Sequence, residues 1–276
     1  MANAGWGDVR RRRPDATWEV VAAGLSEPRS LRVSADGGLT LLEAGSRLVH
    51  LGADGGRKVL ASGLSGAYAA LPAPDGDGHL VTETARHRIV RVRGDGSVTP
   101  YLEQQLATPR AVRPLADGAI AVVDGGGRVV RIAPDGGVEV VASGLGSGLH
   151  GLAVDGAGNL YTGDAAGDRI LRIDPGGGVA VAATTPFPPG AVAWSGQDGL
   201  LVAPLGGRSV YAVDGAGHLA LRWSLGTPVG GDMVADAAGG LWGLGSSATE
   251  LFHVAAGGTE DRYPLAARSA GLQLDG

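Results

Sequence analysis

Four cationic or proton-handling side chains recur about 40 residues apart, and a carboxylate follows each of them 14 or 15 residues later. The pairs are Arg29 with Glu43, Tyr68 with Glu83, Arg110 with Asp124, and His150 with Asp164. A carboxylate beside a histidine fixes its tautomer and raises its basicity. Arginines clamp a carboxylate or an enolate and stabilise developing negative charge. The pattern predicts acid–base chemistry on an anionic or carbonyl-bearing small molecule.

Two groups of residues make up this predicted site. The catalytic groups are His150, Asp164, Tyr68 and Glu83. The substrate-binding groups are Arg29, Arg110, Glu43, Asp124 and Asp232. In this interpretation His150 is the general base, Asp164 orients it, and Tyr68 is the general acid. The same parts serve elimination, cyclisation and hydrolysis, so the pattern predicts a lyase, a cyclase or a hydrolase without choosing among them.

The carboxylates also have a structural explanation. An acid at the end of a strand commonly caps loop N–H groups or pairs with an arginine, and such networks perturb charges as functional sites do. A third use is metal binding. No metal ligand set is predicted and no cofactor is certain, but a divalent cation such as Mg²⁺ or Ca²⁺ on Glu83, Asp124 or Asp164 stays an open alternative.

Short β-type runs separated by Asp-Gly turns carry these residues. Turns of this kind supply the positive-φ positions of tight hairpins, and they recur from Asp36-Gly37 to Asp214-Gly215. The first strand of each unit starts at Arg29, Tyr68, Arg110, His150, Gly190 and Gly231. A period near 40 with four strands per unit predicts an all-β, six-bladed β-propeller of antiparallel blades over residues 17–276.

The two ends of the chain complete this prediction. Residues 1–16 are expected to be a disordered tip. Residues 18–24 resemble a fourth strand, and we expect them to close the ring by joining the last blade. Residues 270–276 resemble one more first strand, which packs beside the closure or starts a truncated repeat.

Antiparallel geometry brings the start of each first strand to the end of the second. The four polar pairs should therefore lie at one end of the central channel, on four successive blades. The fifth and sixth blades carry Gly190 with Pro204 and Gly231 with Gly245, so the site should be open there. The arginines that begin the third strands repeat in five blades and are expected to be scaffold: Arg47, Arg88, Arg128, Arg169 and Arg208. Tyr161 and Trp194 are expected to be core.

The composition excludes several classes of function. Without cysteine the chain has no disulfide scaffold, thiolate metal site or cysteine nucleophile. A net charge of −5 argues against a nucleic-acid binder. No apolar run is long enough for a membrane helix, and none follows residues 10–13 to make a secretory signal. We expect a cytoplasmic protein whose partner is a small molecule.

The segments GLAVDGAGNLYTGD and DRILRIDPGG resemble the repeats of NHL, gluconolactonase-like and virginiamycin B lyase-like propellers. The resemblance covers residues 18–265 and implies a propeller enzyme, including enzymes of secondary metabolism. The lyase-like family carries a histidine at the start of an inner strand and an acid 14 residues later, in a site that holds magnesium; His150 and Asp164 match it. That family has seven blades, and no second ring histidine is found here.

Gluconolactonase-like enzymes resemble the chain in scaffold only. Their metal ligands would fall on Glu27-Pro28-Arg29, His150-Gly151 and Gly231-Asp232, where an arginine cannot ligate a cation and Asp232 is displaced by one position. The resemblance also covers non-catalytic members, so the alternative function is a propeller that binds a protein or a ligand. Such a module needs aromatic or arginine hot spots on its loops. The loops here are short and rich in small residues, apart from TTPFPPG (184–190), which leaves the enzyme as the first choice.

Overall fold

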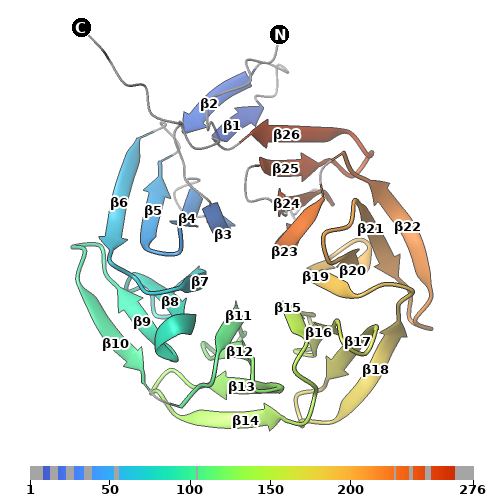
Figure 1. Ribbon diagram of the computed structural model, residues 1–276, viewed down its shortest axis with the longest axis horizontal. Coiled ribbons are helices and arrows are strands. Elements are labelled where there is room, and N and C mark those ends of the chain that lie inside the picture. Colours follow the sequence, from blue (N-terminus) through green and yellow to red (C-terminus); the bar gives the residue numbers. More distant parts are fainter. Residues whose placement is uncertain are drawn as a thin grey trace, which may run out of the picture.

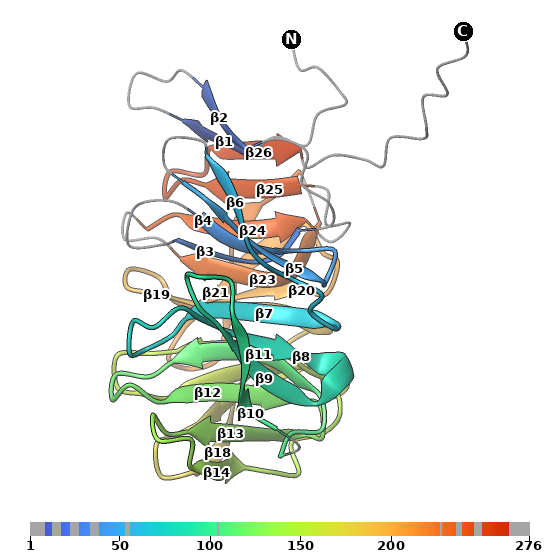
Figure 2. The same ribbon diagram turned by 90° about the vertical axis from the view of Figure 1, so that its left-hand side faces the viewer.

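The computed structural model describes residues 9–12, 18–22, 28–33, 39–52, 56–103, 105–226, 228–235, 239–245 and 250–264. Six four-stranded antiparallel sheets, here called blades 1 to 6 in chain order, stand in a ring (Figure 1). Seen from the side, the first strands run along the axis of the ring (Figure 2). The six-bladed β-propeller is confirmed.

Each blade uses four consecutive strands, ordered from the axis outward. Blade 1 contains β3 (Pro28–Val33), β4 (Leu39–Glu43), β5 (Arg47–Leu51) and β6 (Arg57–Ser62). Blade 2 contains β7 (Ala67–Pro72), β8 (His79–Glu83), β9 (Arg88–Val92) and β10 (Val98–Leu102), with a short 3-10 turn, η1 (Thr84–Arg86), after β8. Blade 3 contains β11 (Pro109–Pro114), β12 (Ile120–Asp124), β13 (Arg128–Ile132) and β14 (Val138–Ala142).

The second half of the ring repeats this order. Blade 4 contains β15 (Leu149–Val154), β16 (Leu160–Asp164), β17 (Arg169–Ile173) and β18 (Val179–Thr184). Blade 5 contains β19 (Pro189–Ser195), β20 (Gly199–Pro204), β21 (Ser209–Val213) and β22 (Leu219–Ser224). Blade 6 contains β23 (Val229–Ala235), β24 (Leu241–Gly245), β25 (Glu250–Val254) and β26 (Glu260–Pro264). We call the end of the ring where the first strands begin the mouth, and the opposite end the far end.

The core lies between the blades. Buried apolar residues form clusters that draw on neighbouring blades: Leu42 of blade 1 shares a cluster with Val81 of blade 2, and Leu201 of blade 5 with Phe252 of blade 6. A lone four-stranded blade would leave these faces in water, so burial of apolar area at about 25 cal/mol per Å² holds the ring together.

The N-terminal segment departs from the expectation. β1 (Val9–Arg12) and β2 (Trp18–Ala22) pair with each other in a separate two-stranded sheet. The described part of this segment, residues 18–22, therefore does not add a strand to the last blade, whose four strands all come from residues 229–264. The hairpin lies beside β26 in Figure 1 instead. Residues 9–12 belong to the segment expected to be disordered, and residues 265–276 lie outside the described residues.

Contacts of β3 with β23 and β24 bring the first and last blades together. Among the described residues, no helix is long and apolar enough to cross a membrane.

Candidate functional site

The acids that end the second strands are out of register with the ring residues by one position. Asp164 lies opposite Leu149, and His150 lies opposite Gly163. The same holds for Asp124, which faces Pro109. Neighbouring residues of a strand point to opposite sides, so an acid and its expected partner do not meet. The predicted pairs of Arg29 with Glu43, Tyr68 with Glu83, Arg110 with Asp124 and His150 with Asp164 are therefore not formed across the strands.

These acids pair instead with the arginines that begin the third strands. The ion pairs, with the separation of their nitrogen and oxygen atoms, are Glu43–Arg47 at 3.1 Å, Glu83–Arg88 at 2.5 Å, Asp124–Arg128 at 2.8 Å and Asp164–Arg169 at 2.9 Å. Glu43 also contacts Arg57 at 2.6 Å. All four carboxylates are buried. The scaffold role expected for the third-strand arginines is confirmed for these four, and the structural explanation of the acids describes their contacts.

The same carboxylates hold loops. Asp124 accepts hydrogen bonds from the backbone N–H groups of Ala107 and Thr108, and Glu83 accepts one from Ser65. These loops lead directly into the strands that carry Arg110 and Tyr68. Asp164 accepts from Gly167, in the loop that follows its own strand. Glu83 and Asp124 thus fix the backbone in front of Tyr68 and Arg110.

A cation does not fit these acids. Glu83, Asp124 and Asp164 belong to three different blades, and each has an arginine and at least one backbone N–H bound to its oxygens. Carboxylates that serve as metal ligands need free lone pairs that converge on one point. In the part of the chain that is described, no three histidine, aspartate or glutamate side chains group as a ligand set.

The ring position brings His150 and Arg110 together on adjacent first strands. His150 is half-buried. Burial and, after it, the positive charge of Arg110 lower the pKa of His150 below the ordinary 6.5. The expectation that a carboxylate raises the basicity of this histidine is therefore wrong. A lowered pKa favours the neutral imidazole, in which one nitrogen can accept a proton.

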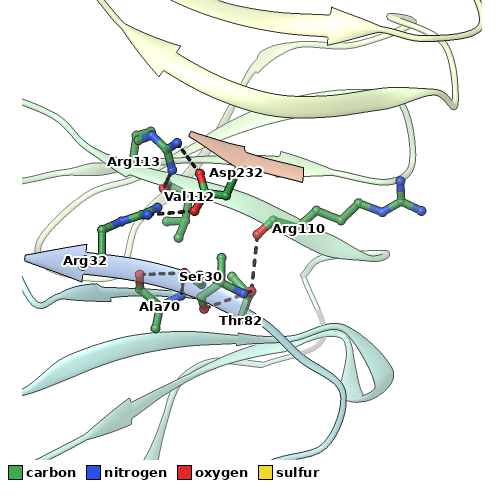
Figure 3. A network of polar contacts seen from close by, with 9 residues as sticks. Ser30, Arg32, Ala70, Thr82, Arg110, Val112, Arg113 and Asp232 are labelled. Carbon is green, nitrogen blue, oxygen red and sulfur yellow. Dashed lines mark hydrogen bonds and ion pairs between the residues drawn. The ribbon is translucent and has the colours of Figure 1, made fainter. Parts of the chain in front are cut away.

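The neighbouring ring residues lie on either side of this pair. Tyr68 is half-buried and packs against the apolar cluster shared by blades 2 and 3. The side chain of Arg110 extends away from Arg113 (Figure 3), while its backbone carbonyl accepts a hydrogen bond from Thr82 Oγ1 at 3.3 Å. The side chain of Arg29 lies outside the described residues. Gly190 takes the corresponding place in blade 5, where it is buried against the backbone of Leu205.

Asp232 lies further along the axis, between two arginines that the sequence pattern did not single out. Its Oδ2 is 2.8 Å from Arg32 Nη1, and its Oδ1 is 2.9 Å from Arg113 Nη2 (Figure 3). Burial would raise the pKa of Asp232, but the charges and hydrogen bonds of Arg32 and Arg113 outweigh it and hold that pKa below 3.8. Both oxygens of the Asp232 carboxylate are thus engaged by guanidinium groups.

A sequence signal for these arginines exists. Arg-x-x-Arg occurs at the starts of two first strands, residues 29–32 and 110–113, and also at residues 10–13, 88–91, 128–131 and 169–172. In a regular strand two residues three apart face opposite sides. Both first strands carry a register shift at these positions, and a bulge of this kind turns the second arginine to the other side of its strand. Arg110 and Arg113 are accordingly both half-buried, with buried Ala111 and Val112 between them.

Two hollows lie at the far end. One of about 740 Å³ is shared by blades 4 and 5, where the rings of Tyr161 and Trp194 stack with centroids 5.5 Å apart. Tyr161 is buried as expected, whereas Trp194 is half-buried and lines the hollow. The other, of about 240 Å³, is lined by the ends of four first strands, and Arg113 and Trp194 are in its wall.

Comparisons with known proteins identify the fold. No protein-family model matches the chain, and no curated protein matches it in sequence. Virginiamycin B lyase from Staphylococcus aureus superposes with a TM-score of 0.71 at 19% identity, covering 88% of this chain and 86% of that one. A catalytically inactive histidine-to-alanine form of that enzyme, solved with quinupristin, superposes with a TM-score of 0.71 at 18% sequence identity. The match covers 86% of this chain and 84% of that one.

Propellers of other functions are similarly close. A putative gluconolactonase gives a TM-score of 0.69 at 17% identity and covers 96% of both chains. A chain of a nidogen/laminin complex superposes with a TM-score of 0.70 at 16% sequence identity, covering 82% of this chain and 93% of that one. These likenesses show that the chain has the propeller fold that the repeats predict.

Proposed function

We propose that this chain is a small-molecule enzyme with its active site at the mouth of the propeller, where His150 is the general base and Arg110 binds an anionic or carbonyl-bearing substrate. The reaction belongs to the lyase, cyclase or hydrolase class. The observation that carries the proposal is that these two residues take the ring positions of two first strands in contact, β11 and β15, where burial and then the charge of Arg110 lower the pKa of His150.

A neutral imidazole beside a guanidinium is suited to proton abstraction. Because the pKa of His150 is lowered, the base is not blocked by a proton at neutral pH. Arg110 places a positive charge next to the position where negative charge develops when a proton leaves the carbon next to a carbonyl group. A substrate carboxylate or oxyanion held by Arg110 would place such a proton near His150.

Tyr68 is the proposed acid. It occupies the ring position of blade 2, next to Arg110 of blade 3. A phenol donates its proton to a leaving group or to an enolate oxygen. Glu83 and Asp124 act as positioning residues in this proposal, since they hold the loops in front of Tyr68 and Arg110. Asp164 holds blade 4 through Arg169.

The comparison with virginiamycin B lyase supports an enzyme of this type. A form of that enzyme in which a histidine is replaced by alanine is catalytically inactive, and its structure was solved with quinupristin. At 18% identity the likeness extends to the scaffold, so the substrate of this chain is a separate question.

The second candidate is a binding module. It is favoured by the acids at the mouth, which are all engaged within their own blades and leave fewer charged groups for chemistry than the sequence pattern indicates. The propeller of the nidogen/laminin complex shows that this fold also occurs in protein assemblies.

Thermal unfolding in the presence of candidate ligands separates the two functions. A ligand that binds the native state raises the midpoint by mass action. We would screen carboxylates, lactones and polyketide-like fragments, with and without Mg²⁺ or Ca²⁺, against the wild type and His150→Gln. A shift in the wild type that Arg110→Gln abolishes, followed by turnover that His150→Gln abolishes, supports the enzyme. Unchanged turnover in His150→Gln and Tyr68→Phe rules out this mechanism.

A further inference from the structure

The cavity of about 240 Å³ at the far end differs in chemistry from the mouth. It is lined by the ends of β11, β15, β19 and β23. Its walls are apolar, and they include Val154, Trp194, Met233 and Val234. Arg113 is the charged group among the lining residues.

Arg113 belongs to a charged cluster with Arg32 and Asp232. Arg32 and Arg113 each carry one positive charge, and Asp232 between them carries one negative charge, which leaves a net charge of +1 on the three side chains. Their side chains are 12%, 15% and 22% exposed, respectively. Positive charge removed from water is costly unless an anion or dipoles compensate it. Burial and the charge of Arg32 accordingly lower the pKa of Arg113.

Arg113 also has donors to spare. It donates from Nη1 to the carbonyl of Val112 and from Nη2 to Asp232 Oδ1, each at 2.9 Å. A guanidinium has five N–H groups, so these two bonds leave others for a ligand in the cavity that Arg113 lines.

We propose that the far-end cavity binds a small carboxylate with a compact apolar tail, whose carboxylate is held by Arg113 and whose tail lies against Trp194, Met233 and Val234. A monoanion neutralises the three-residue cluster. The apolar walls favour a tail over a bare inorganic anion, because the tail gains from leaving water. The volume is below the roughly 300–1,000 Å³ of a drug-sized site, so the ligand is compact. This site is separate from the proposed active site at the mouth.

Calorimetric titration of the wild type with hexanoate, hexanamide and inorganic phosphate tests the proposal. Hexanamide keeps the tail and loses the charge, while phosphate keeps charge and loses the tail. We expect hexanoate to bind at least about tenfold more tightly than either, since a charge-assisted hydrogen bond and an apolar tail are each worth that much. Equal binding of hexanamide, equal binding of phosphate, or no binding of hexanoate at about 10 mM would each overturn it.

Variants locate the ligand. Arg113→Met removes the excess charge and leaves Arg32 paired with Asp232, so it should fold and lose about tenfold or more in hexanoate affinity. Asp232→Asn raises the net charge to +2 and should tighten hexanoate binding. Val234 is 37% exposed in the wall. Val234→Asp places a negative charge in the wall and should repel the carboxylate of the ligand. Val234→Asn has the same shape as Val234→Asp without the charge, so it should weaken binding much less.

A mouth variant is the matched control. His150→Gln should leave hexanoate affinity unchanged, because the ring position lies at the other end of the first strand. Loss of hexanoate binding in His150→Gln together with retention in Arg113→Met and Val234→Asp would place the ligand at the mouth and refute the far-end site. Trp194→Phe should reduce any fluorescence change that accompanies binding.

Discussion

Arg32 and Asp232 lie 200 residues apart in the sequence, and Arg32 Nη1 is 2.8 Å from Asp232 Oδ2. Arg32 belongs to β3 of blade 1 and Asp232 to β23 of blade 6, so this ion pair bridges the two ends of the ring. In the described part of the chain these two blades share no strand. Closure of the ring therefore depends on side-chain contacts such as this one.

Asp232→Asn should destabilise the protein by about 3 kcal/mol, because it removes the negative charge that lies between two guanidinium groups. Arg113→Met should cost clearly less, since it leaves a neutral Arg32–Asp232 pair. Urea unfolding of both variants gives the comparison. Equal losses would mean that the charge balance of the cluster does not matter for stability.

The acid sensitivity of the protein should depend on Asp232. The pKa of Asp232 is lowered in the folded state, so below about pH 5 the unfolded chain takes up this proton first and stability falls with pH. The contribution is complete above the unfolded pKa of 3.8 and is lost as the pH drops through the lower folded value. The stability difference between wild type and Asp232→Asn should therefore shrink towards acid pH. A constant difference between pH 7 and pH 3 would contradict the assignment.

His150 should titrate below the ordinary 6.5, and Arg110→Gln should raise its pKa part of the way back. Burial is the larger cause and persists in the variant, so the pKa should stay below 6.5; Arg110→Lys keeps the charge and is the control. An NMR titration of the imidazole C–H resonance, assigned with His150→Gln, measures this. Because the unfolded chain binds this proton more tightly, stability should fall as the pH drops from 6.5 to the folded pKa.

Asp124 should matter more to the fold than to the chemistry. Its buried carboxylate holds two loop N–H groups and Arg128, so Asp124→Ala should cost about 3 kcal/mol and speed amide exchange at Ala107 and Thr108. Asp117 pairs with Arg131 at the surface, and Asp117→Ala should cause no comparable change. Normal protection of the two amides in Asp124→Ala would contradict a positioning role.

The sequence was sufficient for the blades because Asp-Gly turns and a period near 40 specify them locally. It was insufficient for the site because a bulge changes the side of the strand to which a side chain points, and the sequence does not show where the bulges lie. The strand register differs by one residue from the expected one, so Asp164 pairs with Arg169 and not with His150. Each of the six first strands carries a register shift of this kind. The cluster of Arg32, Arg113 and Asp232 depends on the closed ring, which no local pattern describes. The repeated Arg-x-x-Arg was the available signal.

Ser30 offers a test of how the first two blades are joined. Its φ is +48°, a left-handed conformation that costs a non-glycine residue about 1 kcal/mol. Its hydroxyl accepts from Ala70 N at 2.9 Å and donates to Ala70 O at 3.3 Å, so the strain supports an inter-blade contact. Ser30→Ala loses both bonds and keeps the strain, whereas Ser30→Gly loses both bonds and relieves it. We expect Ser30→Gly to be the more stable variant by about 1 kcal/mol, the reverse of the usual order of Gly and Ala in a strand. Urea unfolding of the two variants decides it, and a more stable Ser30→Ala would show that this backbone relaxes out of the left-handed region.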